Sequence, residues 1–174
     1  MNPRRQYLAL ALTLNILVVA CGLLGLATPA QANGNCVTYF AGRGTGTPGD
    51  PYLVGSELDL AEVSFCRSSS FRQIQDITLA NPWTPLGSNV SPFTGRYDGG
   101  GFNISGLDVN LPTTDEVGLF GYTDGATLTR IRLPNGSVAG RNYVGGLVGQ
   151  AQNTAISYCS SAVSIAGNDD GGGS

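Results

Sequence analysis

Apolar residues in the second half of the chain recur in a short box in which two apolar residues stand between glycines. Two copies of the box occur at an offset of 28 in the numbering, and their members are Gly118, Leu119, Phe120, Gly121, Gly146, Leu147, Val148 and Gly149. Positions after the box agree as well, since Leu128 corresponds to Ile156 at the same offset and Val138 corresponds to Ile165 at an offset of 27. A period between about 20 and 50 residues indicates a solenoid or another repeat array.

The apolar residues that follow each box are spaced for short strands. They are Leu128, Ile131 and Leu133 after the first box, and Ile156, Cys159 and Val163 after the second. Glycine inside a strand marks a bend or a close approach of two backbones. One copy is too small to bury its own apolar face, so a neighbouring copy has to complete the core. The pattern therefore predicts an all-β fold, a parallel β-solenoid whose rungs stack on one another.

Upstream of the boxes, alternating apolar and polar residues predict two further strands and a buried turn. Residues 71–79 alternate with a shift of phase near Asp76, and residues 103–109 alternate without such a shift. The turn at 81–87 carries Trp83 and Leu86, which we expect to be buried. The expected core residues of the second strand are Ile104, Leu107 and Val109.

Residues 56–63 carry the one good helix signal after the N-terminal apolar run. Ser56 can cap the first turn, and Asp59 stands at the third helical position. The residues that can face inward are Leu58, Ala61 and Val63. We expect this short helix to shield the first rung. The predicted domains are a leader at 1–32, a capping segment with the helix at 33–70, and solenoid rungs at 71–174.

The N-terminus has the layout of a secretory signal peptide. A basic head precedes an apolar run over 7–27, and Ala30-Gln31-Ala32 forms a small-x-small cleavage site. We predict a helical leader cleaved between Ala32 and Asn33, a secreted or cell-surface protein, and no membrane segment after cleavage. Two alternatives stay open. The apolar run is long enough to span a bilayer as an uncleaved anchor, and Val18-Val19-Ala20-Cys21 resembles a lipobox that would make Cys21 a lipidated N-terminus.

The charge of the chain excludes whole classes of partner and mechanism. Without the arginines of the leader, Arg4 and Arg5, the remaining 7 arginines face 12 acidic residues, a net charge of −5, and the chain contains neither Lys nor His. Such a surface does not favour nucleic acid, which requires basic clusters. The absence of His removes the usual Ser-His-Asp and Cys-His systems. Two acid pairs remain, Asp115-Glu116 and Asp169-Asp170, but both stand in predicted loops, so we expect no catalytic residue.

Three cysteines follow the predicted leader. In an exported protein Cys36 and Cys66 can form a disulfide that closes the loop between them, and we prefer that pairing to three free thiols. Cys159 corresponds to Ile131 in the repeat and is expected to be a small buried residue. We expect no metal or other cofactor, because His and close Cys pairs are absent. Calcium at Asp98-Gly99-Gly100-Gly101 is the alternative, since oxygen ligands are plentiful.

The order of several short motifs from residue 49 onward resembles that of the GLUG-repeat proteins of bacteria. The motifs are Gly49-Asp50-Pro51-Tyr52-Leu53-Val54, Asp76-Ile77-Thr78-Leu79, Trp83-Thr84-Pro85-Leu86-Gly87, Phe93-Thr94-Gly95-Arg96-Tyr97-Asp98-Gly99, Ile104-Ser105-Gly106-Leu107 and the two boxes. The resemblance covers most of 49–167 and implies a β-solenoid, an extracellular address and no catalytic residue. Similar segments occur in adhesin-like surface proteins and in non-catalytic parts of immunoglobulin A-cleaving metallopeptidases. A further box falls due near residue 173, so we expect a longer array, with a Gly/Ser linker at 171–174 as the alternative.

Two classes of function follow from these features. The preferred one is a structural or adhesive surface module whose partner is a glycan or a surface protein. The alternatives are a β-helix carbohydrate-active protein, which binds or cleaves a polysaccharide, and the repeat region of a larger secreted peptidase. A lyase would gather acidic and basic residues on one outward face, and the candidates are Asp98, Asp108, Asp124, Arg130 and Arg132. The two arginines could also bind a carboxylated sugar or serve as solvated edge charges. Aromatic residues that would line a glycan surface, or cap the rungs, are Tyr97, Phe102, Tyr122 and Tyr143.

Overall fold

The computed structural model describes residues 36–167. The predicted leader, including Cys21 and Ala32, lies outside the described residues, as do Asn33 after the predicted cleavage site and the acid pair Asp169-Asp170. Within 36–167, none of the helices has the length and apolar character needed to cross a bilayer.

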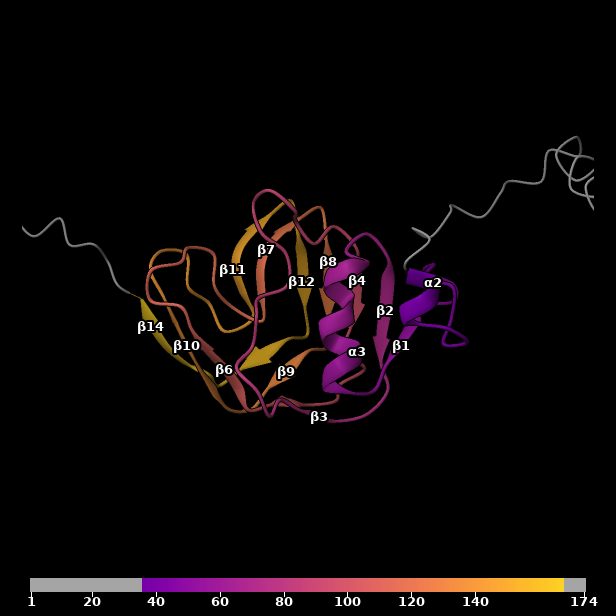
Figure 1. Ribbon diagram of the computed structural model, residues 1–174, viewed down its shortest axis with the longest axis horizontal. Helices are drawn as coiled ribbons and strands as arrows, with labels where there is room; N and C mark the ends of the chain where they lie inside the picture. The colour runs from indigo at the N-terminus through magenta and orange to yellow at the C-terminus, as the bar shows by residue number, and fades with distance from the viewer. Residues whose placement is uncertain (1–35, 168–174) are drawn as a thin grey trace, which may run out of the picture. The chain divides into compact units, whose positions relative to one another are not determined.

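The chain winds into a solenoid in which every ladder between named strands is parallel, as the repeat predicts. The largest sheet has five strands, and Figure 1 shows them following one another from the end that carries α2. In order they are β1 (Tyr52–Val54), β2 (Ser70–Gln73), β4 (Arg96–Asp98), β8 (Thr127–Thr129) and β12 (Ala155–Ser157). Successive turns of the chain thus each add one strand to this sheet.

The remaining strands form a second side and the corners of the turns. A three-stranded sheet contains β6 (Leu107–Asn110), β10 (Gly136–Gly140) and β14 (Ser164–Gly167). Three two-stranded ladders pair β3 (Ile77–Thr78) with β5 (Ile104–Ser105), β7 (Phe120–Asp124) with β11 (Val148–Gln152), and β9 (Arg132–Leu133) with β13 (Ser160–Ser161). The helical segments are α2 (Cys36–Tyr39), α3 (Glu57–Glu62) and the 3-10 turn η1 (Val63–Phe65).

The strand register confirms both repeat offsets found in the sequence. Leu128 lies opposite Ile156 in the β8–β12 ladder, and Val138 lies opposite Ile165 in the β10–β14 ladder. The offset changes inside the box itself. Val117 pairs with Val144, whereas Phe120 pairs with Val148, so the second copy accommodates one extra residue at Gly145-Gly146.

One core runs through all the turns, and its character changes along the stack. Near the N-terminal end aromatic rings lie on one another, with ring centroids 4.7 Å apart for Phe40 and Tyr52 and 5.9 Å apart for Tyr52 and Phe71. Aliphatic side chains take over later, with Leu128 and Val138 fully buried. The predicted burial of Trp83 and Leu86 and of the expected core residues Ile104, Leu107 and Val109 is confirmed.

The helix signal is confirmed at α3, but two of its three expected core residues are wrong, since Leu58 and Ala61 are exposed and only Val63 is buried. The side chain of Ser56 caps the helix by accepting a hydrogen bond from the backbone N–H of Asp59 at 3.1 Å. Leu60 and Val63, three residues apart, turn toward the core and are buried. Leu58 is two positions from Leu60 and therefore points away, with 67 % of its surface exposed.

The alternating stretch at 71–79 is two strands rather than one. β2 ends at Gln73 and β3 begins at Ile77, so the predicted shift of phase near Asp76 is a corner between two sheets. The buried amide of Gln73 holds this corner, because its Nε2 donates to the carbonyl oxygens of Gln75 at 2.9 Å and Asn103 at 3.0 Å.

The N-terminal end of the stack is closed by a cross-link. Cys36 and Cys66 form the expected disulfide, with their Cα atoms 5.6 Å apart, and this bond ties α2 to the residue that follows η1. Cys159 is free and packs against the core, but it is half-buried rather than buried because no further described turn lies on top of it. β1 pairs with β2 although it lies within the predicted capping segment, so the first ladder already begins at Tyr52.

Candidate functional site

The two boxes are structural corners where successive turns touch backbone to backbone. A methyl group at Gly118 would lie 2.6 Å from the carbonyl oxygen of Gly145, and one at Gly149 would lie 2.5 Å from the backbone nitrogen of Val117. Leu119 and Phe120 are fully buried beside them. In the second copy the apolar residues are half-buried and pack against the same core; they are Leu147 and Val148. Glycine is required at these corners because any side chain would push two turns apart.

Carboxylates of one turn repeatedly accept hydrogen bonds from an asparagine backbone N–H in a neighbouring turn. Three such contacts are Asp76 to Asn103 at 2.9 Å, Asp115 to Asn142 at 3.1 Å, and Glu116 to Asn89 at 3.0 Å. Each pair is 27 residues apart, which is one of the two repeat offsets in the sequence. We call these three contacts the acid clamps. Both members of the acid pair Asp115-Glu116 belong to them.

Asp115 also makes a bidentate ion pair that fixes its charge. Its two oxygens accept from Arg141 Nε at 2.8 Å and Arg141 Nη2 at 2.6 Å. The hydrogen bonds from Arg141, aided by the backbone N–H of Asn142, lower the pKa of Asp115 to about 2, and burial opposes this shift only in part. Asp115 is therefore a carboxylate at neutral pH and lacks the proton that a general acid must donate.

The outward face of the five-stranded sheet carries a cluster of arginines around one acid. Arg72 and Arg96 project from β2 and β4, and Asp98 accepts hydrogen bonds from Arg130, one of them at 2.9 Å from Nε. Burial raises the pKa of Asp98, but the hydrogen bonds from Arg130 and Gly100 and the charges of Arg130 and Arg72 lower it further, so the net shift is downward.

A depression of about 160 Å³ lies on this face. Its outward-facing lining includes Pro48, Pro51, Arg72, Arg96, Asp98, Thr127 and Thr129. The sequence pattern did not reveal it, since residues far apart along the chain become neighbours only through the ladder register.

The five residues proposed for a lyase do not come together as a set. Asp98 and Arg130 are paired on the five-stranded sheet. Asp108 lies in β6, Asp124 ends β7, and Arg132 begins β9, which are strands of three other sheets. Among residues 36–167 there is no group of three His, Cys, Asp or Glu side chains that could hold a metal ion.

Comparison with known protein families decides the nature of the repeat. A family model described as the GLUG motif matches residues 140–166, which span the second box and strands β11 to β13. The chain contains a GLUG motif.

Two proteins that are similar in sequence to this chain are much longer than it is. Halomucin of Haloquadratum walsbyi is 36 % identical over 148 residues, which is 75 % of this chain and 2 % of the relative. A Gly-rich membrane protein of Evansella cellulosilytica is 35 % identical over 93 residues, which is 48 % of this chain and 11 % of the relative. The chain thus spans only a small part of either protein. No solved structure matches the chain.

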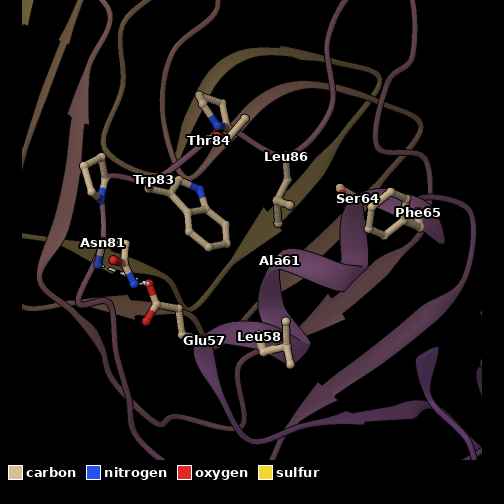
Figure 2. Close-up of a pocket in the computed structure, with 11 residues that line it drawn as sticks. Glu57, Leu58, Ala61, Ser64, Phe65, Asn81, Trp83, Thr84 and Leu86 are labelled. Carbon is tan, nitrogen blue, oxygen red and sulfur yellow. Dashed lines mark hydrogen bonds between the residues drawn. The ribbon is translucent and has the colours of Figure 1, made fainter.

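A second surface feature lies upstream of the GLUG motif, where α3 and η1 face the segment 81–86 across a groove of about 450 Å³ (Figure 2). Leu58 and Phe65 are exposed at its wall. Glu57 is occupied within the protein, because it accepts hydrogen bonds from the backbone N–H groups of Ala80 and Asn81. Trp83 turns its ring nitrogen inward, donating to the carbonyl oxygen of Leu119 at 3.0 Å.

The four aromatic residues considered for a glycan surface differ in their burial. Tyr97 is fully buried in the ring stack of the core, 5.9 Å from Phe120 between ring centroids. Tyr122 is half-buried and donates its hydroxyl to Gln152 of the next turn. Phe102 and Tyr143 are exposed. One of the four thus belongs to the interior, and a second bridges two turns.

Proposed function

We propose that this chain is a non-catalytic repeat module that works outside the cell, in a structural or adhesive role at the bacterial cell surface. The observation that carries the proposal is the GLUG-containing stack of parallel turns. Each turn adds a strand to the five-stranded sheet and thereby extends the same face, which suits a scaffold or an extended binding surface. The name of one relative, a Gly-rich membrane protein, is consistent with a place at the cell envelope.

The roles of the acidic residues support the non-catalytic part of the proposal. Asp76, Asp115 and Glu116 hold neighbouring turns together, and Asp98 is paired with Arg130. These carboxylates are engaged as hydrogen-bond acceptors within the protein, which suits a structural role. The alternative of a β-helix lyase requires acids and bases gathered on one face, and the candidates instead occupy four sheets.

The test of the proposal is the location of the protein on living cells. The full chain, carrying a C-terminal epitope tag, is expressed in a bacterium, and intact cells are labelled with antibody and then treated briefly with protease. We expect labelling without permeabilisation and loss of the label after protease. Label that appears only in permeabilised cells would contradict a surface role. Release of unsaturated sugars from polygalacturonate by the purified protein would contradict the absence of catalysis.

A further inference from the structure

We propose that the outward face of the five-stranded sheet binds an acidic polysaccharide through the carboxylates of its sugars. The inference rests on the adhesive part of the proposed function and assigns it a site and a chemical class of partner. The binding strip consists of the outward residues of β2, β4 and β8 together with Arg130, which follows β8.

Charge is the first argument for the strip. The chain after the predicted leader carries a net charge of −5, yet on this face three arginines stand against the single acid Asp98. Arg130 neutralises Asp98, and the guanidinium of Arg72 lies further from it, with 3.9 Å between Nε and Oδ2. Arg96 is exposed and makes no ion pair within residues 36–167. Two positive charges are therefore in surplus on one face of an acidic protein.

The register fixes where Arg72 and Arg96 stand on the sheet. Arg96 lies opposite Thr127, and Arg72 lies in the row that continues through Asp98 and Thr129. Neighbouring strands are about 4.8 Å apart, so Arg96 and Thr127 lie side by side in one row, and Arg72 and Thr129 flank the paired Asp98 in the other. A sugar chain laid across the strands would meet guanidinium groups, which bind carboxylates through two parallel hydrogen bonds, and hydroxyl groups suited to sugar hydroxyls. Part of the polymer can bind in the depression of about 160 Å³ on this face.

The same face is poorly suited to single-stranded nucleic acid. Binding of that kind relies on exposed aromatic rings on which bases stack. On these strands the aromatic residues are Tyr52, Phe71 and Tyr97, and all three are buried on the inner side of the sheet. The exposed ring of Tyr158 follows β12, one strand beyond the strip. The strip itself thus provides cations and hydroxyls without an exposed aromatic ring, which favours a polysaccharide.

Binding of the full chain to immobilised polygalacturonate tests the strip, with fully methyl-esterified polygalacturonate as the matched neutral polymer. We expect the wild type to bind only the acidic polymer, and more weakly as salt is raised. Arg72→Gln and Arg96→Gln should each weaken binding about tenfold, the loss expected for one charge-assisted hydrogen-bonded contact. Arg132→Gln is the matched control, since Arg132 is also exposed but lies on β9 outside the depression, and its affinity should change less than about twofold.

The outcomes separate the strip from the proposed function. Unchanged affinity in Arg72→Gln and Arg96→Gln, or equal binding to the methyl ester, would overturn the strip and leave an adhesive module with another site. Equal or tighter binding to a single-stranded DNA oligonucleotide would overturn the assignment to polysaccharide. Absence of binding to polygalacturonate by a protein that is displayed on cells would overturn the strip alone, whereas absence from the cell surface would overturn the proposed function. Thermal melting of each variant verifies that the fold is intact.

Discussion

At the scale of single residues, three acids of this protein join neighbouring turns. In each acid clamp a carboxylate accepts a backbone N–H from an asparagine 27 residues away. Hydrogen bonds to an ionised group are stronger than those between neutral groups, so a few well-placed acids can align loops that have little apolar surface. The spacing of these acids and asparagines equals the shorter of the two repeat offsets, 27 residues, and this was the signal in the sequence that would have revealed their role.

The clamp at Asp115 predicts how stability depends on pH. The pKa of Asp115 in the folded protein is about 2, below the ordinary value of about 3.9 that an unfolded chain shows. The ionised form therefore stabilises the fold above about pH 4, and this contribution is lost as the pH falls toward 2. We expect Asp115→Asn to lower the melting temperature at neutral pH, with the gap to the wild type closing toward pH 2.

The control for this experiment is Glu116→Gln. It removes the same charge at the adjacent position, where the carboxylate accepts the N–H of Asn89 but has no bidentate arginine. Its melting temperature should be less affected at neutral pH. A gap between wild type and Asp115→Asn that stays constant from pH 7 to about pH 2 would contradict the link between the Arg141 ion pair and stability.

At the scale of elements, the apolar pattern predicted what lies inside, but not every corner. The repeat offsets identified facing positions correctly because stacked parallel strands must repeat their inward side chains. The break between β2 and β3 was visible only as a shift of phase, since the buried amide of Gln73 holds a corner that apolar periodicity does not describe. Leu58 and Ala61 were misplaced because the face of a six-residue helix is set by its cap and its packing, not by composition.

The glycine of the first box offers a direct test of the corner geometry. Gly118→Ala would place a methyl group 2.6 Å from the carbonyl oxygen of Gly145, so one turn has to move. We expect the substitution to lower the free energy of unfolding by about 1–3 kcal/mol, as overpacking does elsewhere. Urea unfolding measures the change. Gly49→Ala is the matched control, because a methyl group at Gly49 meets nothing within 4 Å, and its effect should stay within about 0.5 kcal/mol. Equal effects of the two substitutions would contradict the close approach.

At the scale of the whole stack, burial declines from one end of the described chain to the other. The first turns are covered by α2, the Cys36–Cys66 disulfide and the ring of Phe40. In the GLUG segment the equivalent ladder positions are only partly covered, with Ile156 46 % exposed and Ile165 48 % exposed. The sequence repeat predicted equal roles for these positions, and the structure gives them unequal burial because each turn depends on the next for its cover.

Substitutions at Leu128 and Ile156 test this decline in burial. The two residues face each other in the β8–β12 ladder and differ mainly in how far they are buried. Leu128 is fully buried, so Leu128→Ala should cost about 2–5 kcal/mol in urea unfolding. Ile156 keeps nearly half of its surface in water, so Ile156→Ala should cost about half as much or less. The comparison is made at low protein concentration, because another chain laid on the last turn would bury Ile156. Equal costs that persist on dilution would mean that the last turn is covered within the chain itself, and the decline in burial along the stack would then be wrong.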